Sequence, residues 1–353
     1  MRAACPPISR RRAAQCFQSG AVAVSRTADC AAALSAVSES ILRPLAAELG
    51  EKRLVIVSDG ALAYLPFAAL SDPSGAAPLV VRHEIVSLPS ASALASLRRE
   101  IQGRKPAPLD LAVLADPVFD RDDPRVRAAL ASPGAAARTV RTLRGDPSGE
   151  EDLPGGLTRL PRLLYSREEA RRILALVPPG RGLAALGFDA SLRTVFSAAL
   201  DRYRIIHIAT HGFLNSSHPG LSGLVFSLVD SNGQAQNGFL RLNDLYGLRL
   251  NCDLVVLSAC NTGLGKEIHG EGLIGLTRGF LYAGAARVIV SLWNVDDEAT
   301  ADLMQRFYSA VLGPRALRPA AALREAQVSM WNDARWKSPY YWAGFRLEGE
   351  WRP

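Results

Sequence analysis

Short apolar runs alternate with amphipathic segments along most of the chain, and this pattern predicts an α/β protein. The runs are rich in β-branched residues and bounded by turn residues, as buried strands are. The other segments carry apolar residues at the spacing of one helix face. Strands are expected at 54–60, 84–90, 109–119, 204–212, 252–260 and 287–293, and helices at 31–50, 166–176, 192–200, 272–285 and 297–312.

The order of these segments predicts a mostly parallel central sheet. Strands without a polar face, interleaved with helices, are typical of sheets that helices cover on both sides. A pair of further strands is expected at 223–230 and 238–245. Functional side chains in such folds gather at the carboxyl ends of the strands. Here those ends carry His211, Cys260 and the pair Asp296 and Asp297.

A polar segment divides the chain into two parts. Residues 121–156 are rich in Arg, Pro, Gly and Asp without a sustained period, which predicts an exposed connection. It separates an N-terminal α/β half at 31–120 from a second half at 157–353. Residues 1–30 have no clear period and are expected to form a poorly ordered tail. The chain shows neither a secretory signal nor an apolar run of about 20 residues, so we expect a cytoplasmic protein without a membrane partner.

Composition and charge narrow the classes further. A hydrophobic fraction of 48% over 353 residues describes an ordinary globular protein. The net charge is +7, but most basic residues are arginines dispersed among Ala-rich segments, so we expect no nucleic-acid partner. The five cysteines are odd in number and lack paired spacing, which suggests no disulfide framework. An important cysteine is therefore expected to be a free thiol.

His211 is a candidate general base. It ends the run RIIHIATHG, just before Gly212, where an imidazole with a near-neutral pKa can meet a substrate. His207 shares its strand face but lies between two isoleucines, which indicates a buried structural histidine. A lone histidine would not establish a catalytic site, so the case depends on a companion.

Cys260 is that companion, at the end of LVVLSAC and before the turn residues NTG. A thiol at a strand end opens to a cleft, and an imidazole on a neighbouring strand can activate it as a nucleophile. The backbone N–H groups of Gly212 and Cys260 are candidate oxyanion donors. The alternative is a buried core thiol, since free cysteine is among the most buried residue types. Spacing alone does not decide between the two.

Two other kinds of site were weighed. The stretch GEGLIG at 270–275 matches a dinucleotide fingerprint and precedes Asp296, but about ten residues separate it from the preceding strand, which breaks the tight turn that the motif needs. The histidines and the two late cysteines lack zinc-site spacing. We therefore expect neither a cofactor nor a metal, and dinucleotide binding stays a remote alternative.

The segments HIATHGF, VVLSACNTG and GEGLIGLTRGFLYAGAARVIVSLWNVDDEAT together resemble the CHAT family of caspase-like cysteine peptidases, which are related to separase and gingipain. The similarity extends from about residue 31 to the C-terminus. It implies a caspase-like three-layer α/β/α sandwich with a mostly parallel sheet, and a pseudo-peptidase-like N-terminal half. The family's catalytic dyad falls on His211 and Cys260, which implies a cysteine endopeptidase acting on protein or peptide substrates.

The resemblance also implies candidate specificity residues. In separase-like relatives the W-x-V-x-D motif contributes an acid to the substrate pocket, and Asp297 matches it, which implies cleavage after Arg or Lys. Asp296 or Asp297 could instead cap the following helix. Glu271 is a second acidic candidate. Many family members carry helical repeats ahead of this domain, and the sequence leaves three alternatives open here: target selection by the short N-terminal segment, a separate targeting or activating protein, or a start that lies further upstream. A catalytically silent scaffold is the alternative function.

Overall fold

A computed structural model of the chain describes residues 27–75, 77–131, 160–213, 218–258, 260–261 and 271–352. Most of the predicted tail and most of the predicted connection lie outside these ranges. Two parts of them are described and are helical. The tail ends in the first turn of α2 (Thr27–Ile41), and the connection contains α5 (Pro124–Leu130), capped by Asp123.

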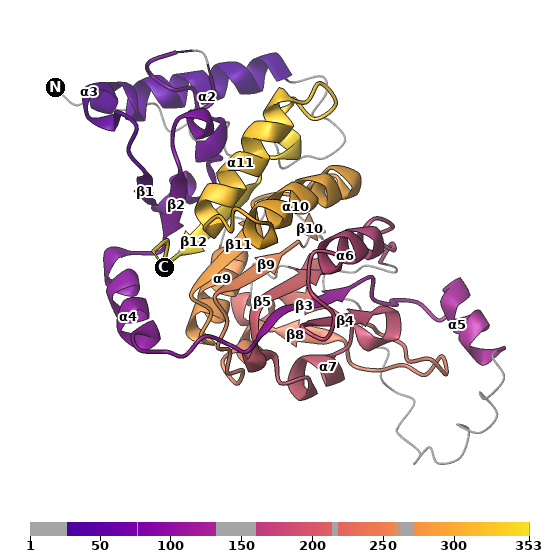
Figure 1. The fold of residues 1–353 in the computed structure, drawn as a ribbon. Coiled ribbons are helices and arrows are strands. Elements are labelled where there is room, and N and C mark those ends of the chain that lie inside the picture. Colours follow the sequence, from indigo (N-terminus) through magenta and orange to yellow (C-terminus); the bar gives the residue numbers. More distant parts are fainter. Residues whose placement is uncertain are drawn as a thin grey trace.

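An eight-stranded sheet forms the centre of the described structure (Figure 1). Its order is β1-β2-β12-β11-β9-β5-β3-β4, and the described neighbours pair in parallel except β11 with β12. The strands are β1 (Leu54–Val57), β2 (Ile85–Leu88), β3 (Leu109–Ala115), β4 (Gly182–Leu186), β5 (Tyr203–Ala209), β9 (Leu254–Leu257), β11 (Arg287–Ser291) and β12 (Phe345–Gly349). The mostly parallel sheet that the sequence predicted is confirmed.

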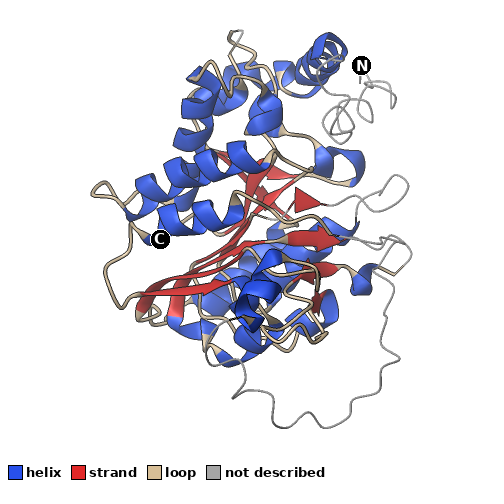
Figure 2. Ribbon diagram, turned by 90° about the vertical axis from the view of Figure 1, so that its right-hand side faces the viewer, coloured by secondary structure: helices blue, strands red, loops and turns tan. Residues whose placement is uncertain are grey.

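Helices cover both faces of this sheet (Figure 2). Alternate residues of β3 enter different cores: Leu111 and Val113 pack with α6 (Ser166–Leu174), α10 (Asp297–Leu312) and α11 (Pro319–Asn332), whereas Leu114 packs with α7 (Leu192–Ser197) and α9 (Glu271–Tyr282). This period of two, with apolar side chains on both faces, is what a buried parallel strand requires. The expected three-layer α/β/α architecture is therefore present.

A smaller four-stranded sheet adjoins the carboxyl ends of β5 and β9. Its order is β10-β6-β7-β8, formed by β10 (Cys260–Asn261), β6 (His211–Phe213), β7 (Gly223–Val225) and β8 (Phe239–Arg241). The predicted strand pair at 223–230 and 238–245 is thus confirmed as the antiparallel pair β7 and β8, although both strands are shorter than expected. The short helix α8 (Leu242–Leu245) follows β8 directly.

Several element boundaries differ from the expectation for local reasons. The helix predicted at 31–50 stops at Ile41, and a 3-10 turn containing Pro44 separates it from α3 (Ala46–Leu49), since proline lacks the N–H that continues a helix. The strand predicted at 109–119 ends at Ala115, because Asp116 has a positive φ of 53°. The sequence analysis also missed α4 (Ala91–Ile101), β4, α11 and β12.

The core on the α9 face should be sensitive to truncation. Phe280 is 2% exposed, and Phe280→Ala is expected to lower the free energy of unfolding by about 3–5 kcal/mol because it leaves a cavity. Tyr282 lies two residues further on the same helix and is 70% exposed, so Tyr282→Ala should cost less than about 1 kcal/mol. Urea unfolding of both variants measures the difference, and equal losses would contradict this packing.

Candidate active site

Two neighbouring strands run from the large sheet into the small one and carry His211 and Cys260. In the large sheet β5 and β9 pair in parallel, with His207 opposite Val256 and Ile208 opposite Leu257. The continuations β6 and β10 pair in parallel in the small sheet, with His211 opposite Cys260 and Gly212 opposite Asn261. The two strands therefore stay adjacent across the break at Thr210.

The register brings the two candidate residues together. Cys260 and His211 are direct partners on strands that lie about 4.8 Å apart, the ordinary spacing of a sheet. They are separated by almost fifty positions along the chain, and the strand alternation of the sequence had indicated only that they end neighbouring strands. The structure thus confirms the proximity of the two backbones.

The imidazole of His211 is held in one orientation. Its Nε2 lies 2.6 Å from the carbonyl oxygen of Pro161, and its ring stacks at a tilt against Phe119 with centroids 5.1 Å apart. A carbonyl only accepts hydrogen bonds, so this contact requires a proton on Nε2. Within the described residues, Nδ1 is buried and has no hydrogen-bond partner. The ring therefore keeps one nitrogen protonated and the other available as a base.

Burial determines the charge of this histidine. His211 is 1% exposed, and the loss of hydration lowers its pKa from the usual value, with the Pro161 carbonyl opposing that shift only in part. The imidazole is consequently neutral at neutral pH. A neutral imidazole with a free Nδ1 is the form that can take a proton from a thiol.

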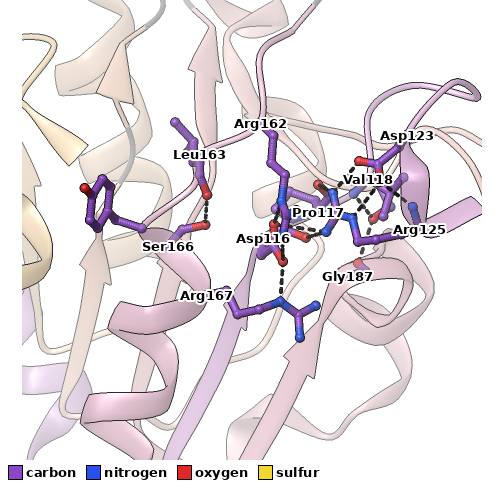
Figure 3. Close-up of polar contacts among 12 residues, drawn as sticks. Asp116, Pro117, Val118, Asp123, Arg125, Arg162, Leu163, Ser166, Arg167 and Gly187 are labelled. Carbon is purple, nitrogen blue, oxygen red and sulfur yellow. Dashed lines mark hydrogen bonds and ion pairs between the residues drawn. The ribbon is translucent and has the colours of Figure 1, made fainter. Parts of the chain in front are cut away.

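Pro161 is a site residue that sequence reasoning did not find. The segment around it reaches the histidine from a distant part of the chain, and its position is fixed by Arg162, whose guanidinium binds both carboxylate oxygens of Asp116 (Figure 3). Leu160 packs against Phe213 beside the small sheet. The interacting group of Pro161 is a backbone carbonyl, so no residue type in the sequence signals it.

His207 is a buried structural histidine, as its flanking isoleucines indicated. It is fully buried, its Nδ1 lies 3.1 Å from the hydroxyl of Tyr308, and its Nε2 lies 3.0 Å from Oε1 of Glu169. Tyr308 belongs to α10 and Glu169 to α6, so this group ties β5 to the helices above it. The contact between Nε2 and Glu169 lacks hydrogen-bond geometry, so within the described residues only Nδ1 of the His207 ring is hydrogen-bonded.

The two aspartates at the start of α10 have different partners. Asp296 is the N-cap, and its carboxylate accepts a hydrogen bond of 2.9 Å from the Ala299 N–H. Asp297 is half-buried and accepts a hydrogen bond of 2.8 Å from the backbone N–H of Tyr165. Burial raises the pKa of Asp297 to about 6, and the neighbouring carboxylate of Glu169 adds to the shift. The capping role expected for one of the pair belongs to Asp296.

The remaining candidate residues lie in α9 and in the small sheet. Glu271 is the first residue of α9. Gly212 lies inside the small sheet, opposite Leu224 of β7 and Asn261 of β10. Gly275, part of the dinucleotide-like stretch, packs against α8, where an added Cβ would lie 3.2 Å from Leu242 Cδ2. That contact agrees with reading this glycine as one that allows close helix packing.

The described residues present no set of three or more His, Cys, Asp or Glu side chains arranged to hold a metal ion. Of the cysteines, Cys252 is a buried free thiol whose pKa burial raises to about 12, so it is unreactive at neutral pH. Cys30 is disulfide-bonded, which the cysteine pattern had not predicted. In the described ranges no helix is long and apolar enough to cross a membrane.

The fold is thus a mostly parallel, helix-covered sheet, with His211 and Cys260 in register on two short strands that continue from adjacent strands of that sheet. The chain belongs to the CHAT domain family, whose model matches residues 31–350. The resemblance found in the sequence is thereby confirmed.

Two curated relatives are forms of Tetratricopeptide repeat protein 28. The mouse (Mus musculus) protein is 27% identical over 320 residues, and the human (Homo sapiens) protein is 28% identical over 319 residues. Each match covers 84% of this chain but only 12% of the relative, so the chain spans about an eighth of their length.

Two solved structures resemble parts of this chain. The first is in the Saccharomyces cerevisiae separase–securin complex, with a TM-score of 0.45 and 11% identity, over 84% of this chain and 15% of that one. The second is the Arg-specific cysteine proteinase gingipain R, with a TM-score of 0.43 and 8% identity, over 76% of this chain and 54% of that one.

Proposed function

We propose that the protein is a cysteine endopeptidase in which Cys260 is the nucleophile and His211 the general base. The observation that carries the proposal is the register of β6 and β10, which pairs these two residues directly. The free Nδ1 of a neutral His211 supports it, since a base must be able to accept the thiol proton. Membership of the CHAT family agrees with this chemistry.

The proposed reaction is amide hydrolysis through a thioester. His211 takes the thiol proton at Nδ1, the thiolate attacks the substrate carbonyl, and the imidazolium then protonates the leaving amine. The same nitrogen subsequently activates a water molecule that hydrolyses the thioester. The hydrogen bond from Nε2 to Pro161 supports this cycle, because the carbonyl stabilises the imidazolium while it exists.

We assign the oxyanion donors to the backbone N–H groups of Gly212 and Cys260. Both belong to the paired strands β6 and β10, one residue apart in register. The sequence had suggested the same pair.

We propose that Asp297 gives the substrate pocket a preference for Arg or Lys, with Asp296 and Glu271 as further acidic groups of that region. A half-buried carboxylate attracts a guanidinium or ammonium more strongly than an exposed one does. Only one of its oxygens is engaged by the Tyr165 N–H, which supports a second interaction on the other. Protein or peptide substrates and a separate targeting or activating protein belong to this proposal.

The pKa of Asp297 makes the specificity dependent on pH. Its carboxylate is charged above about pH 6 and neutral below, so the preference for Arg over a neutral residue should strengthen between pH 5 and pH 7.5. Asp297→Asn keeps an acceptor for Tyr165 but loses the charge. We expect it to lower kcat/KM for Arg substrates by about 10- to 100-fold and to remove the pH dependence of the preference. A positional-scanning peptide library measures both.

Asp296→Asn is the matched control for that variant, because asparagine caps a helix as well as aspartate does. Because Asp296 is only a further acidic group of the proposed pocket, its variant should weaken the basic preference less than Asp297→Asn does. If Asp296→Asn removed the basic preference and Asp297→Asn did not, the pocket assignment would move to the cap residue.

One observation favours the alternative of a binding scaffold. The imidazole of His211 is 1% exposed, so a substrate reaches it only after the neighbouring chain moves. A scaffold should keep its cellular function in a Cys260→Ala variant, whereas a peptidase should lose it. Peptide turnover by the purified full chain that disappears in this variant would exclude the scaffold.

A further inference from the structure

A buried ion-pair cluster adjoins the candidate dyad, and the reaction proposed above does not use it. The carboxylate of Asp116 is fully buried and faces three guanidinium groups (Figure 3). Arg162 binds it through Nε and Nη2 at 2.7 and 2.9 Å, Arg167 approaches at 2.5 Å, and Arg125 at 2.9 Å. Arg125 also pairs with Asp123.

The backbone holds Asp116 at the carboxyl end of the sheet. It follows β3, the neighbour of β5, and has a φ of 53°, a conformation that residues other than glycine rarely adopt. Such a conformation persists where the surroundings determine it strongly. Arg125 adds to the constraint by donating to the carbonyl oxygens of Asp116 and Pro117.

Arg162 connects the cluster to His211, the proposed base. The peptide group between Pro161 and Arg162 contains the carbonyl that accepts the hydrogen bond from His211. Fixing the Arg162 side chain on Asp116 at two points therefore restricts the direction of that carbonyl. The pyrrolidine ring of Pro161 fixes φ at that residue, which leaves ψ as the rotation that turns its carbonyl.

We propose that Asp116 is a positioning residue: through Arg162 it aims the Pro161 carbonyl at His211, keeps the ring proton on Nε2 and leaves Nδ1 as the base. The catalytic consequence rests on the function proposed above. A carboxylate that orients a histidine usually contacts the ring itself. Here the carboxylate of Asp116 acts indirectly, through its bidentate pair with Arg162. That pair fixes both the distance and the direction of the guanidinium.

The same strand supplies a matched control. At its other end, Asp110 forms a bidentate pair with Arg181, with contacts of 2.5 and 2.8 Å. If ion pairs at the ends of β3 serve only to stabilise the sheet, Asp110→Asn and Asp116→Asn should affect His211 alike. Arg167→Ala is a second control, since it removes one guanidinium from Asp116 without changing the Pro161 peptide.

The test reads the tautomer of His211 by nitrogen NMR of the full chain labelled in its histidines, with the His211 signals identified by their loss in His211→Gln. In the wild type, Asp110→Asn and Arg167→Ala, we expect a proton on Nε2 and none on Nδ1. In Asp116→Asn and Arg162→Ala, we expect a mixture of both tautomers. Asp116→Asn removes a buried charge and is the variant more prone to unfold. Arg162 is 36% exposed, so we expect Arg162→Ala to stay folded and to provide the same test.

Either of two results overturns the inference: a proton on Nδ1 in the wild type, or an unchanged tautomer in folded Arg162→Ala. The kinetic counterpart is a fall in kcat of about 10- to 100-fold in Arg162→Ala with little change in KM, and a smaller loss in Arg167→Ala. The tautomer is read without a substrate. Absence of peptide cleavage by the wild type would therefore contradict the proposed function and leave this test intact.

Discussion

Cys260→Ala is expected to lower kcat/KM for peptide cleavage by on the order of 10⁵- to 10⁶-fold, because the proposed thioester forms on the sulfur that this variant lacks. The variant removes one sulfur atom, so its free energy of unfolding should remain close to that of the wild type. Steady-state cleavage of the best library peptide, followed in parallel with urea unfolding, separates the two effects.

Cys252→Ala is the control for this experiment. Cys252 is fully buried, and its thiol is unreactive because burial raises its pKa to about 12. Its replacement should leave kcat/KM unchanged and cost only stability, about 1 kcal/mol. Cleavage that survives Cys260→Ala, or that disappears equally in both variants, would contradict the role of Cys260.

His211→Gln should reduce kcat by about 10⁴-fold or more while KM changes little. The glutamine amide can still donate to the Pro161 carbonyl, but it cannot accept the thiol proton. The acid limb of the wild-type pH profile should lie at lower pH than an ordinary histidine would give, because burial lowers the pKa of His211. The acid limb of the pH profile for kcat on a substrate without a basic residue measures this.

His83→Gln serves as the comparison. His83 is also buried, and its Nδ1 contacts the carbonyl of Lys52 at 2.8 Å, but it lies beside β2 and away from the small sheet. We expect it to lower stability without a selective loss of kcat. A loss of kcat as large as that of His211→Gln would show that the effect comes from general destabilisation.

The sequence alone was sufficient to predict the central strands and the two candidate residues at their ends. The run LVVL of β9 and the run RIIHIA of β5 are apolar on both faces, so their burial and their place in a parallel sheet followed from composition. His211 and Cys260 were found for the same reason, as chemically active residues where those runs stop. Their direct pairing arises because both chain segments leave the large sheet and continue side by side in the small one. No local sequence pattern predicts that change of sheet.

The contacts that orient the site could not be predicted because they join distant segments. The Asp116 cluster brings together β3, α5 and α6 across the predicted connection, and each residue alone resembles an ordinary polar turn or helix residue. Likewise, β12 lies between β11 and β2, antiparallel to the first and parallel to the second, with polar Arg346 and Glu348 paired to each other. Because these two residues are charged, the segment lacks the apolar run from which the other strands were predicted.

Proton transfer between His211 and Cys260 is the step on which the proposed activity depends most. The rate at which iodoacetamide alkylates Cys260, followed by peptide mass spectrometry between pH 5 and pH 9, tests this without a substrate. We predict that Cys260 reacts faster than an ordinary thiol at pH 7, that His211→Gln removes this advantage, and that Cys252 stays unmodified in the folded protein. Equal rates for Cys260 in the wild type and in His211→Gln would contradict the account.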